Sequence, residues 1–383
     1  MELKKINYAQ FKGEPGEWVL EGLTLGKINL LVGRNASGKT RALNVINGLA
    51  NLLSGRLKLQ FRSGEYRTEF EHDGKHLTYN LAYRDSQVLS EEFASDGSMF
   101  LERGSGGRGR IRAEREAKDI EFQTPENELA AVARQDSLQH AFLSPLKQWG
   151  DCVYHFAFGE KLGKDRFAVF LKDPGARIGF DPKDTTQVVA AFKNGLREFG
   201  DSFRQCVTTD MAAVGYPLDE IEVAAPVSAS VSAPFSGEAV GLNVREHGLA
   251  GITDQIDMSQ GMFRALSVII QVNYLSMSGK AGCMLIDDVG EGLDFERSCA
   301  LIEILMNKAE TSAFQLVMST NDRFVMNKVP LEAWALLDRQ GGKCRVHNYE
   351  NSKPIFDEFK TTGMSNFDFF AVDFLHEEHV VNE

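Results

Sequence analysis

The residues Gly33 to Thr40 read GRNASGKT and match the phosphate-loop pattern G-x-x-x-x-G-K-[ST]. Glycines at Gly33 and Gly38 allow the backbone to wrap closely around a phosphate, with its N–H groups pointing inward. Lys39 would bring a positive charge to the β- and γ-phosphates, and the Thr40 hydroxyl would ligate Mg²⁺. The pattern therefore predicts a nucleotide-binding loop made of Gly33, Arg34, Asn35, Ala36, Ser37, Gly38, Lys39 and Thr40.

The segments on either side of this loop distinguish a phosphate site from an ordinary glycine turn. Residues 27–32 (KINLLV) are a continuous apolar run, which suits a strand buried on both faces of a sheet. Apolar residues within 40–53 recur at helical spacing. Because a strand precedes the loop and a helix follows it, with its positive N-terminal end at the loop, the sequence favours nucleotide binding over a plain turn.

A second candidate site is a pair of acidic residues at the end of another apolar strand. Residues 283–286 (CMLI) are followed directly by Asp287 and Asp288. We expect Asp287 to hold Mg²⁺, directly or through water, and Asp288 to polarise the water that attacks the γ-phosphate. Taken alone, two acids after a strand are typical of a surface turn. Together with the loop at 33–40 they predict a Walker B motif.

A third motif lies between these two in the chain. Residues 257–266 read DMSQGMFRAL and begin a long helix, expected over 261–277, that ends just before the acidic strand. The string Ser259-Gln260-Gly261 is by itself typical of a helix N-cap. Its place shortly before the acidic strand gives it a second interpretation.

The order of these motifs resembles that of the ABC-type ATPase heads, specifically the SMC/RecF/OLD-like branch, which includes free-standing prokaryotic ATP-binding proteins of the AAA family. In that family a signature sequence, commonly L-S-G-G-Q, precedes Walker B, and residues 258–262 (MSQGM) occupy its place. The family's D-loop follows Walker B, and residues 290–294 (GEGLD) match it through Gly-Leu-Asp. The resemblance covers 1–55 and 250–325 well, and 56–250 only in general layout.

The resemblance implies that two copies sandwich two ATP molecules between them. Ser259, Gln260 and Gly261 of one copy would then meet the γ-phosphate held by the other copy. Asp294 of each D-loop would cross the interface near the partner's phosphate loop. The alternative is that Ser259 only caps a helix within one subunit.

Three positions depart from the family's pattern. The family usually has Glu after the Walker B Asp, and this chain has Asp288, whose shorter side chain predicts slow hydrolysis or a contribution from Glu291. The family's switch residue is usually His, and this chain has Asn321, which donates a hydrogen bond but cannot exchange a proton at neutral pH. Gln135, expected at the end of a strand over 130–134, is the candidate for the family's Mg-sensing glutamine.

Strands that alternate with helices predict an α/β fold with a mainly parallel core sheet. The resemblance makes this fold an ABC-type head of the P-loop NTPase class, with a mixed sheet, flanking helices, an antiparallel β subdomain and a helical insertion. We expect four segments: an N-terminal lobe at 1–175, a helical insertion and connector at 176–240, a C-terminal lobe at 241–350 and an acidic, Phe-rich tail at 351–383. Other expected elements are strands at 128–133, 282–286, 314–318 and 334–337, helices at 137–149, 184–199 and 295–309, and a small-residue connector at 224–234.

Composition excludes several classes of protein. With 54 acidic and 42 basic residues the net charge is −12, opposite in sign to that of a protein built to coat nucleic acid. Five widely spaced cysteines without a C-x-x-C favour neither a disulfide framework nor a zinc knuckle, and fit a reducing compartment. No apolar leader opens the chain, and the longest apolar run, 265–286, contains several polar residues, so we expect no membrane span and a cytoplasmic protein.

Two further segments stand out by charge. The stretch 103–118 is the only concentrated basic one, and we expect it to form either a mobile charged hairpin or a contact with a nucleic-acid backbone. The tail from Glu350 to Glu383 has eight acids, two lysines and six phenylalanines. Six phenylalanines are too many for a disordered acidic tail, so we expect them to pack on the ATPase domain or to dock a partner.

From these motifs we expect an ATPase that uses ATP and Mg²⁺, turns over slowly and dimerises with ATP. No nuclease domain or coiled coil is evident in the sequence, so the expected role is control of a separate protein effector, in DNA repair or anti-phage defence. The alternative function is a stand-alone DNA-binding ATPase of the RecF/SMC type, acting through residues 103–115.

Overall fold

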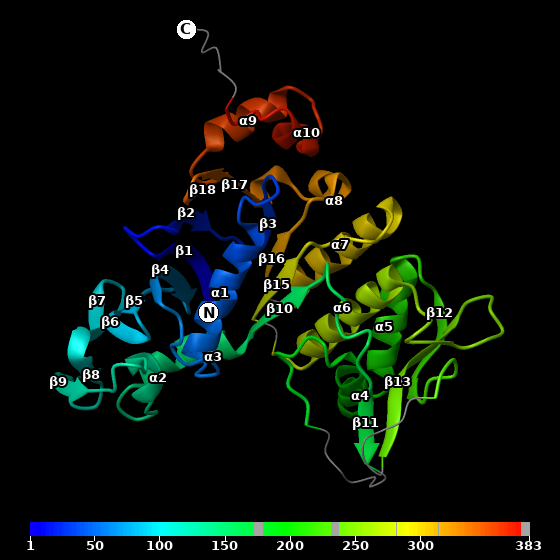
Figure 1. Ribbon diagram of the computed structural model, residues 1–383, viewed down its shortest axis with the longest axis horizontal. Helices are drawn as coiled ribbons and strands as arrows, with labels where there is room; N and C mark the ends of the chain where they lie inside the picture. The colour runs from blue at the N-terminus through cyan, green and yellow to red at the C-terminus, as the bar shows by residue number, and fades with distance from the viewer. Residues whose placement is uncertain (172–178, 231–236, 281, 313, 377–383) are drawn as a thin grey trace. The chain divides into compact units, whose positions relative to one another are not determined.

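The computed structural model describes residues 1–171, 179–230, 237–280, 282–312 and 314–376 (Figure 1). Contacts divide the chain into two compact units: the first comprises Met1–Val153 and Val329–Glu383, and the second Tyr154–Lys328. The four segments expected from the sequence are a different division of the chain and stay a prediction. The small-residue connector at 224–234 lies partly outside the described residues.

The first unit is built on a mixed sheet with the strand order β3-β17-β18-β2-β1-β4-β5-β6-β7-β8-β9. Two neighbouring pairs, β17 with β3 and β18 with β2, are parallel, and the other pairs are antiparallel. The expectation of a mainly parallel sheet is wrong here, because short turns join β4 to β9 in succession and such turns connect only antiparallel strands. The strands are β1 (Glu2–Gln10), β2 (Trp18–Thr24), β3 (Ile28–Val32), β4 (Ser63–His72), β5 (Lys75–Arg84), β6 (Gln87–Ser95), β7 (Ser98–Arg103), β8 (Arg108–Ala113), β9 (Lys118–Gln123), β17 (Trp334–Gln340) and β18 (Lys343–Asn348).

The helices of the first unit are α1 (Lys39–Leu53), α2 (Ala130–Ala133), α3 (Ser144–Asp151), α9 (Lys353–Thr361) and α10 (Asn366–Ala371). The strand expected at 128–133 is wrong: the buried Glu91 carboxylate accepts hydrogen bonds from the backbone N–H of Ala130 (2.7 Å) and Ala131 (2.8 Å) and so caps a short helix instead. The helix expected at 137–149 begins only at Ser144, because Pro145 occupies its first turn.

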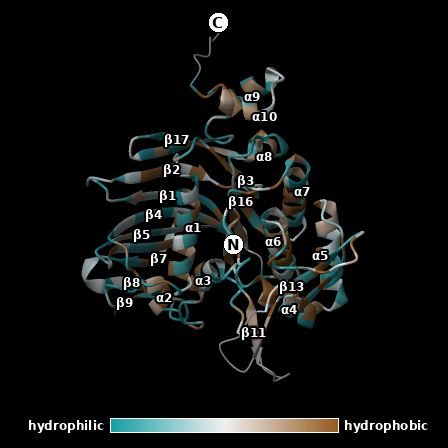
Figure 2. Cartoon of the chain, turned by 45° about the vertical axis from the view of Figure 1, so that its right-hand side comes forward, coloured by the Kyte–Doolittle hydropathy of each residue, from teal (hydrophilic) through white to brown (hydrophobic). Residues whose placement is uncertain are grey.

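Helix α1 follows the sequence pattern closely. Its buried face includes Leu43, Ile46 and Leu49, all fully buried, and α1 packs against α3. Truncating one such leucine to alanine costs about 2–5 kcal/mol, so this face fixes the helix whose N-terminus the phosphate loop adjoins. Along β4 to β6 the buried side chains mostly alternate with more accessible ones, and Figure 2 shows the matching mixture of hydrophilic and hydrophobic residues.

The second unit has its own parallel pair, β15 with β16, and β10 lies next to β15. A separate antiparallel sheet has the order β11-β13-β12, with β14 paired to β13. The strands are β10 (Val153–Ala157), β11 (Ala168–Leu171), β12 (Leu218–Ala224), β13 (Gly237–Glu246), β14 (Thr253–Asp254), β15 (Cys283–Asp287) and β16 (Gln315–Ser319). The helices are α4 (Val188–Phe199), α5 (Asp201–Ala213), α6 (Gln260–Met277), α7 (Phe295–Thr311) and α8 (Arg323–Lys328).

Helix α6 is the central helix of the second unit. It packs against both α4 and α5 and is buried from Gly261 to Leu275. Its interior polar groups have partners, since Asn273 donates to Asp210 at 2.7 Å and Gln271 donates to the Thr185 carbonyl at 2.9 Å. A helix that is apolar on nearly all sides must be enclosed, and this enclosure holds the signature string at its N-terminus in place.

The Phe-rich C-terminal segment packs within the first unit. This agrees with the expectation that its phenylalanines pack on the rest of the chain. Phe356, Phe359 and Phe369 are buried, and the Phe369 ring meets that of Trp334 edge-on with centroids 6.4 Å apart. These contacts provide the apolar burial that a disordered acidic tail lacks. Over the part of the chain that the structure describes, no helix is long and apolar enough to cross a membrane.

Candidate nucleotide site

The loop Gly33–Thr40 joins β3 to α1 in the first unit. A Cβ atom at Gly33 would lie 2.5 Å from the Ser37 Oγ and 3.0 Å from the Leu337 carbonyl oxygen, so this position accepts only glycine. Gly38 has a φ of +110°, which other residues rarely adopt, and a Cβ there would lie 3.2 Å from the Trp18 ring. Both glycines of the motif are thus required by close approach or by backbone conformation.

The side chains of this loop leave a compact set of donors. Lys39 is only 7% exposed, and its Nζ donates to the Gly33 carbonyl at 2.8 Å, so the ammonium group lies across the loop. The Ser37 hydroxyl is buried and has no hydrogen-bond partner among the described residues. A buried hydroxyl without a partner costs folding free energy, and this one belongs to a loop whose motif suits an anion. Thr40, Arg34, Asn35 and Ala36 are exposed.

Trp18 supports the loop from β2. Its ring is 1% exposed, and the Arg41 guanidinium lies 4.1 Å above the ring centroid. This cation–π contact joins the first turn of α1 to β2. Sequence reasoning missed Trp18, because nothing in the spacing of a tryptophan 20 residues before Gly38 marks it as a neighbour of the loop.

Asp287 and Asp288 follow the pattern expected for the end of β15 in the second unit. Asp287 is 8% exposed, and the Ser319 hydroxyl at the end of β16 donates to its carboxylate. Asp288 has a φ of +53° and its backbone N–H donates to the same Ser319 Oγ at 3.0 Å. Ser319 therefore holds the Asp287 carboxylate and the Asp288 backbone. Asn321 lies beside them, and its Nδ2 donates to Asp288 Oδ1 at 3.4 Å.

The loop after β10 completes the surroundings of these carboxylates. A Cβ atom at Gly159 would lie 2.7 Å from Glu291 Oε2 and 3.5 Å from Asp288 Oδ2, so Glu291 and Asp288 both face this loop. Arg264 of α6 donates to the carbonyls of Glu160 (2.9 Å), Glu291 (2.8 Å) and Gly159. One buried guanidinium thus ties the signature helix to the loop after β10 and to the loop after β15. The sequence offered no local signal for this role.

The signature and D-loop strings are adjacent in the second unit. Ser259 caps α6 by accepting a hydrogen bond from the Met262 N–H at 3.2 Å. A Cβ atom at Gly261 would lie 2.6 Å from the Gly292 carbonyl oxygen, so Gly261 permits this close packing of the two loops. Gln260 Nε2 donates to the Glu160 carbonyl at 3.4 Å. Asp294 caps α7 by accepting from the Arg297 N–H at 3.0 Å, and it also pairs with the Arg297 side chain.

His155 of β10 is a neighbour of Asp287 that sequence reasoning missed. Burial lowers the pKa of His155, while the charges of Asp287 and Glu160 act in the opposite direction. Its Nε2 is buried and has no hydrogen-bond partner among the described residues. A lone histidine in a strand carries no motif, and only the sheet order, with β10 beside β15, brings it to this place.

Two expected residues lie in other settings. Gln135 follows helix α2 and not a strand, so the strand end on which its assignment depended is absent; its role stays a prediction. Arg103 is 2% exposed, pairs with the buried Glu91 at 3.6 Å and donates to the carbonyls of Pro125 and Glu128. Arg103 is therefore part of the core, because its alternation along β7 turns it inward.

No protein-family model matches the sequence, and no curated protein matches it either. Among solved structures, an SMC head bound to the C-winged helix domain of ScpA is 13% identical, with a TM-score of 0.52 over 91% of this chain and 97% of that chain. An SMC head domain with an extended coiled coil from Pyrococcus furiosus, bound to the C-terminal domain of ScpA, is 11% identical, with a TM-score of 0.50 over 94% and 99%.

These likenesses define the class of fold. At 11–13% identity a structural match shows the fold alone. The chain has the fold of the SMC head, an α/β fold with a large mixed sheet, and the fold class expected from the sequence is confirmed.

Proposed function

We propose that this protein is an ATP-binding ATPase of the SMC/RecF/OLD-like branch of ABC-type heads. The observation that carries the proposal is the phosphate loop, in which Gly33 and Gly38 meet strict steric requirements beside a largely buried Lys39. A loop of this form at the N-terminus of α1 offers backbone N–H groups and a helix dipole to an anion. The SMC-head fold supports the same conclusion at the level of the whole chain.

Each unit carries an oxygen group of the kind expected to hold Mg²⁺. Thr40 offers a hydroxyl at the start of α1, and Asp287 offers a carboxylate oriented by Ser319. Both are oxygen ligands, which Mg²⁺ prefers. Bound Mg²⁺ would neutralise charge on the β- and γ-phosphates, while Lys39 would hold those phosphates.

Asp288 is the proposed general base for water. Its backbone N–H is held by Ser319, its carboxylate accepts from Asn321, and Glu291 faces the same loop as a second acid. Burial lowers the pKa of His155, which favours the neutral form of this ring beside Asp287. We propose slow hydrolysis, because Asp288 reaches less far than the glutamate usual in this family.

We further propose that ATP joins two copies and that the dimer controls a protein effector, in DNA repair or anti-phage defence. The N-terminus of α6, with Ser259 as its cap, would meet the γ-phosphate held by the other copy. SMC heads in the compared structures bind domains of ScpA, which is in keeping with a protein partner for a head of this fold.

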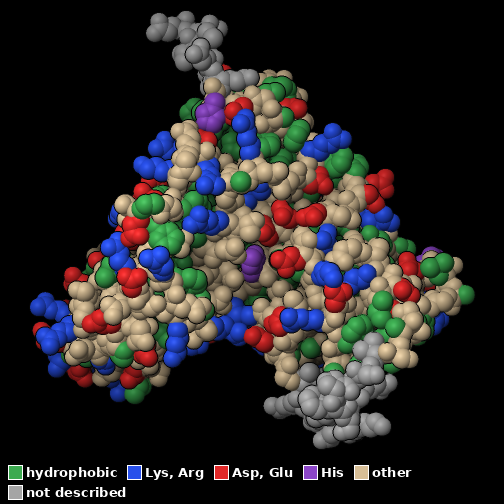
Figure 3. Space-filling view, in the orientation of Figure 1, with side chains coloured by type: hydrophobic (Ala, Val, Ile, Leu, Met, Phe, Trp, Pro, Cys, Tyr) green, Lys and Arg blue, Asp and Glu red, His purple; other side chains and the backbone are tan. Residues whose placement is uncertain are grey.

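The alternative of DNA binding through 103–115 has weaker support. Besides the buried Arg103, the arginines of β8 lie opposite acids: Arg110 is registered with Glu102 and Glu121, and Arg112 with Asp119. Blue and red side chains lie together on this part of the surface in Figure 3. Cross-strand acids reduce the net field that a nucleic-acid backbone would meet.

Equilibrium binding of a fluorescent ATP analogue with Mg²⁺ tests the proposal. We expect Lys39→Ala to weaken binding at least about tenfold, since a charge-assisted contact to phosphate contributes about 1.5–3 kcal/mol. Lys58→Ala, which removes an exposed lysine from the same unit, is the control and should bind as the wild type does. Equal affinity of the Lys39→Ala and wild-type proteins would refute the proposal.

A further inference from the structure

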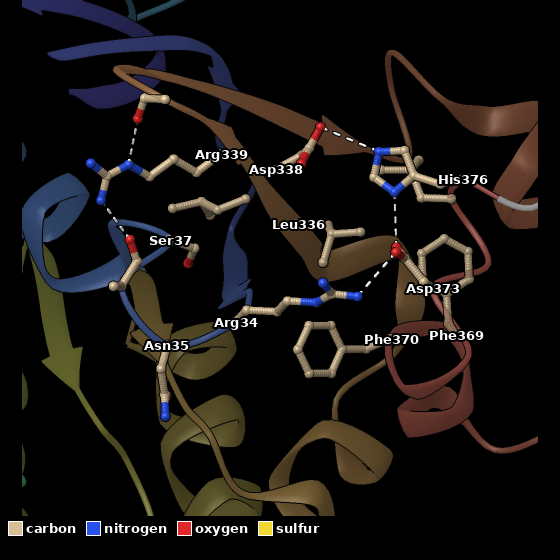
Figure 4. Close-up of a pocket in the computed structure, with 14 residues that line it drawn as sticks. Arg34, Asn35, Ser37, Leu336, Asp338, Arg339, Phe369, Phe370, Asp373 and His376 are labelled. Atoms are coloured by element: carbon tan, nitrogen blue, oxygen red, sulfur yellow. Dashed lines mark hydrogen bonds and ion pairs between the residues drawn. The ribbon is translucent and has the colours of Figure 1, made fainter. Parts of the chain in front are cut away.

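The phosphate loop contacts two segments that come more than 300 residues later in the chain (Figure 4). A cavity of about 320 Å³ lies between the loop, the end of β17 and the C-terminal segment that follows α10. Arg34 faces this cavity from the loop, Asp338 and Arg339 from β17, and Asp373 and His376 from the C-terminal segment. All of these residues belong to the first unit.

A chain of polar contacts runs across the cavity. The Arg34 guanidinium pairs with the Asp373 carboxylate at 3.1 Å. His376 Nδ1 lies 2.9 Å from Asp373 and its Nε2 lies 3.3 Å from Asp338. Arg339 donates to the carbonyl of Ala36 at 2.8 Å, which adds a direct contact between β17 and the loop.

The turn after α10 directs Asp373 toward the loop. Asp373 has a φ of +58°, and its N–H donates to the Phe370 carbonyl at 3.3 Å. The backbone at Asp373 is therefore set by the end of α10, and α10 is in turn held by the buried Phe369. A carboxylate in this position neutralises a cation of the phosphate loop and places a negative charge beside the loop.

We propose that Asp373 competes with nucleotide phosphate for Arg34, so that docking of the C-terminal segment and nucleotide binding oppose each other. This inference rests on the proposed function. A carboxylate and a phosphate are both anions that a guanidinium binds, and the contact with Asp373 holds the Arg34 guanidinium toward the C-terminal segment. Because coupling between two equilibria is reciprocal, nucleotide must loosen the C-terminal segment by the same factor by which docking weakens nucleotide binding.

A double-mutant cycle on the full chain tests this competition. The affinity of the fluorescent ATP analogue is measured for the wild type, Asp373→Asn, Arg34→Ala and the double variant. We expect Asp373→Asn to bind the analogue about two- to fivefold more tightly, as the loss of one exposed ion pair allows. In the Arg34→Ala background, Asp373→Asn should give no gain.

Glu358→Gln is the matched control, because it removes the same charge from an exposed side chain of α9 in the first unit. An equal gain with Glu358→Gln, or an equal gain of Asp373→Asn with and without Arg34, overturns the proposal in favour of a general charge effect. Unchanged or weaker binding by Asp373→Asn also overturns it. If Lys39→Ala binds as the wild type does, the proposed function itself has failed, and that result is distinct from these.

Hydrogen exchange provides a second, independent readout. At fixed pH, the amides of 366–376 should exchange faster when the wild-type protein is saturated with the analogue, and should not change in Arg34→Ala. Slower exchange on saturation would contradict the competition. A merely structural ion pair would leave exchange in both proteins unaffected by nucleotide, which would equally overturn it.

Discussion

Asp288 has a backbone conformation that limits which residues can replace it. Its φ of +53° lies in the left-handed region, which asparagine tolerates about as well as aspartate. Asp288→Asn therefore removes the carboxylate while keeping the turn and its N–H bond to Ser319. It is a clean test of the water-activating role.

We expect Asp288→Asn to lower the rate of ATP hydrolysis by about 100-fold or more, because general bases contribute about 10²–10⁴-fold. The affinity for the ATP analogue should stay within about twofold, since Asp288 is proposed to act on water and not on phosphate. Phosphate release and equilibrium binding are the measurements. Glu310→Gln, an exposed residue of α7, is the control, and wild-type turnover by Asp288→Asn would move the role to Glu291.

The places of residues in a contiguous motif could be predicted, and those of residues that act across the fold could not. Gly33, Lys39 and Asp287 stand at fixed local spacings that steric and charge requirements impose. Arg264 donates to carbonyl groups more than 100 residues earlier in the chain. His155 is brought near Asp287 because its strand, β10, lies next to β15. No local pattern encodes either relation, because both arise only when the second unit folds.

At the scale of elements, the titratable side chain of His376 joins the segment after α10 to β17. Hydrogen bonding to Asp373, reinforced by the charges of Asp373 and Asp338, raises the pKa of His376. Arg34 and Arg339 also face the cavity that His376 lines, and His347 of β18 carries a further charge when protonated. The protonated form of His376 is thus the one that joins the C-terminal segment to β17.

The sign of the pH dependence follows from this. A raised pKa means that His376 contributes stability fully below the ordinary histidine value of about 6.5 and loses it as the pH rises through the raised value. The free energy of unfolding of the wild type minus that of His376→Gln should therefore shrink across that interval. Because the side chain is 47% exposed, the contribution is under about 1 kcal/mol.

Urea unfolding of both proteins at several pH values measures this difference. His247→Gln is the control, since His247 also pairs with an aspartate but lies in the second unit and is 71% exposed. A difference that grows with pH would contradict the assignment of His376 as the protonated partner.

Element types were predicted best for long helices, whose apolar residues recur over several turns. The helix expected at 40–53 and the long helix expected at 261–277 agree with α1 and α6 to within a residue at each end. The strand expected at 128–133 failed because its apolar residues are too few to distinguish strand from helix, and the carboxylate that caps the helix comes from Glu91, far away in the chain.

At the scale of the whole molecule, the proposed ATP-linked dimer requires Ser259 and Asp294 to contact the other copy as well as their own chain. Within its own chain, Ser259 already caps α6 and Asp294 already caps α7 and pairs with Arg297. A cap leaves the other N–H groups of the first turn of α6 free to meet a phosphate from outside. The contacts within the subunit are therefore compatible with a shared site and also with a simple cap.

Mixing two inactive variants separates these alternatives. Lys39→Ala lacks its own phosphate charge, and Ser259→Arg places a bulky cation where the γ-phosphate of the other copy would bind. If the sites are shared, a one-to-one mixture forms some dimers in which one site has an intact Lys39 from one copy and an intact Ser259 from the other. We expect the mixture to recover up to about a quarter of wild-type hydrolysis, because half of randomly formed dimers are mixed and each restores one site of two.

Sedimentation of the Asp288→Asn protein measures dimer formation directly, since its slow turnover keeps ATP bound. ATP should raise the sedimenting mass and ADP should not, because only the γ-phosphate reaches the signature of the other copy. Ser259→Arg in the same background should stay at the lower mass with ATP. A mixture that is no more active than its two components, together with a mass that ATP does not change, would show that each subunit has a self-contained site and that Ser259 is only a helix cap.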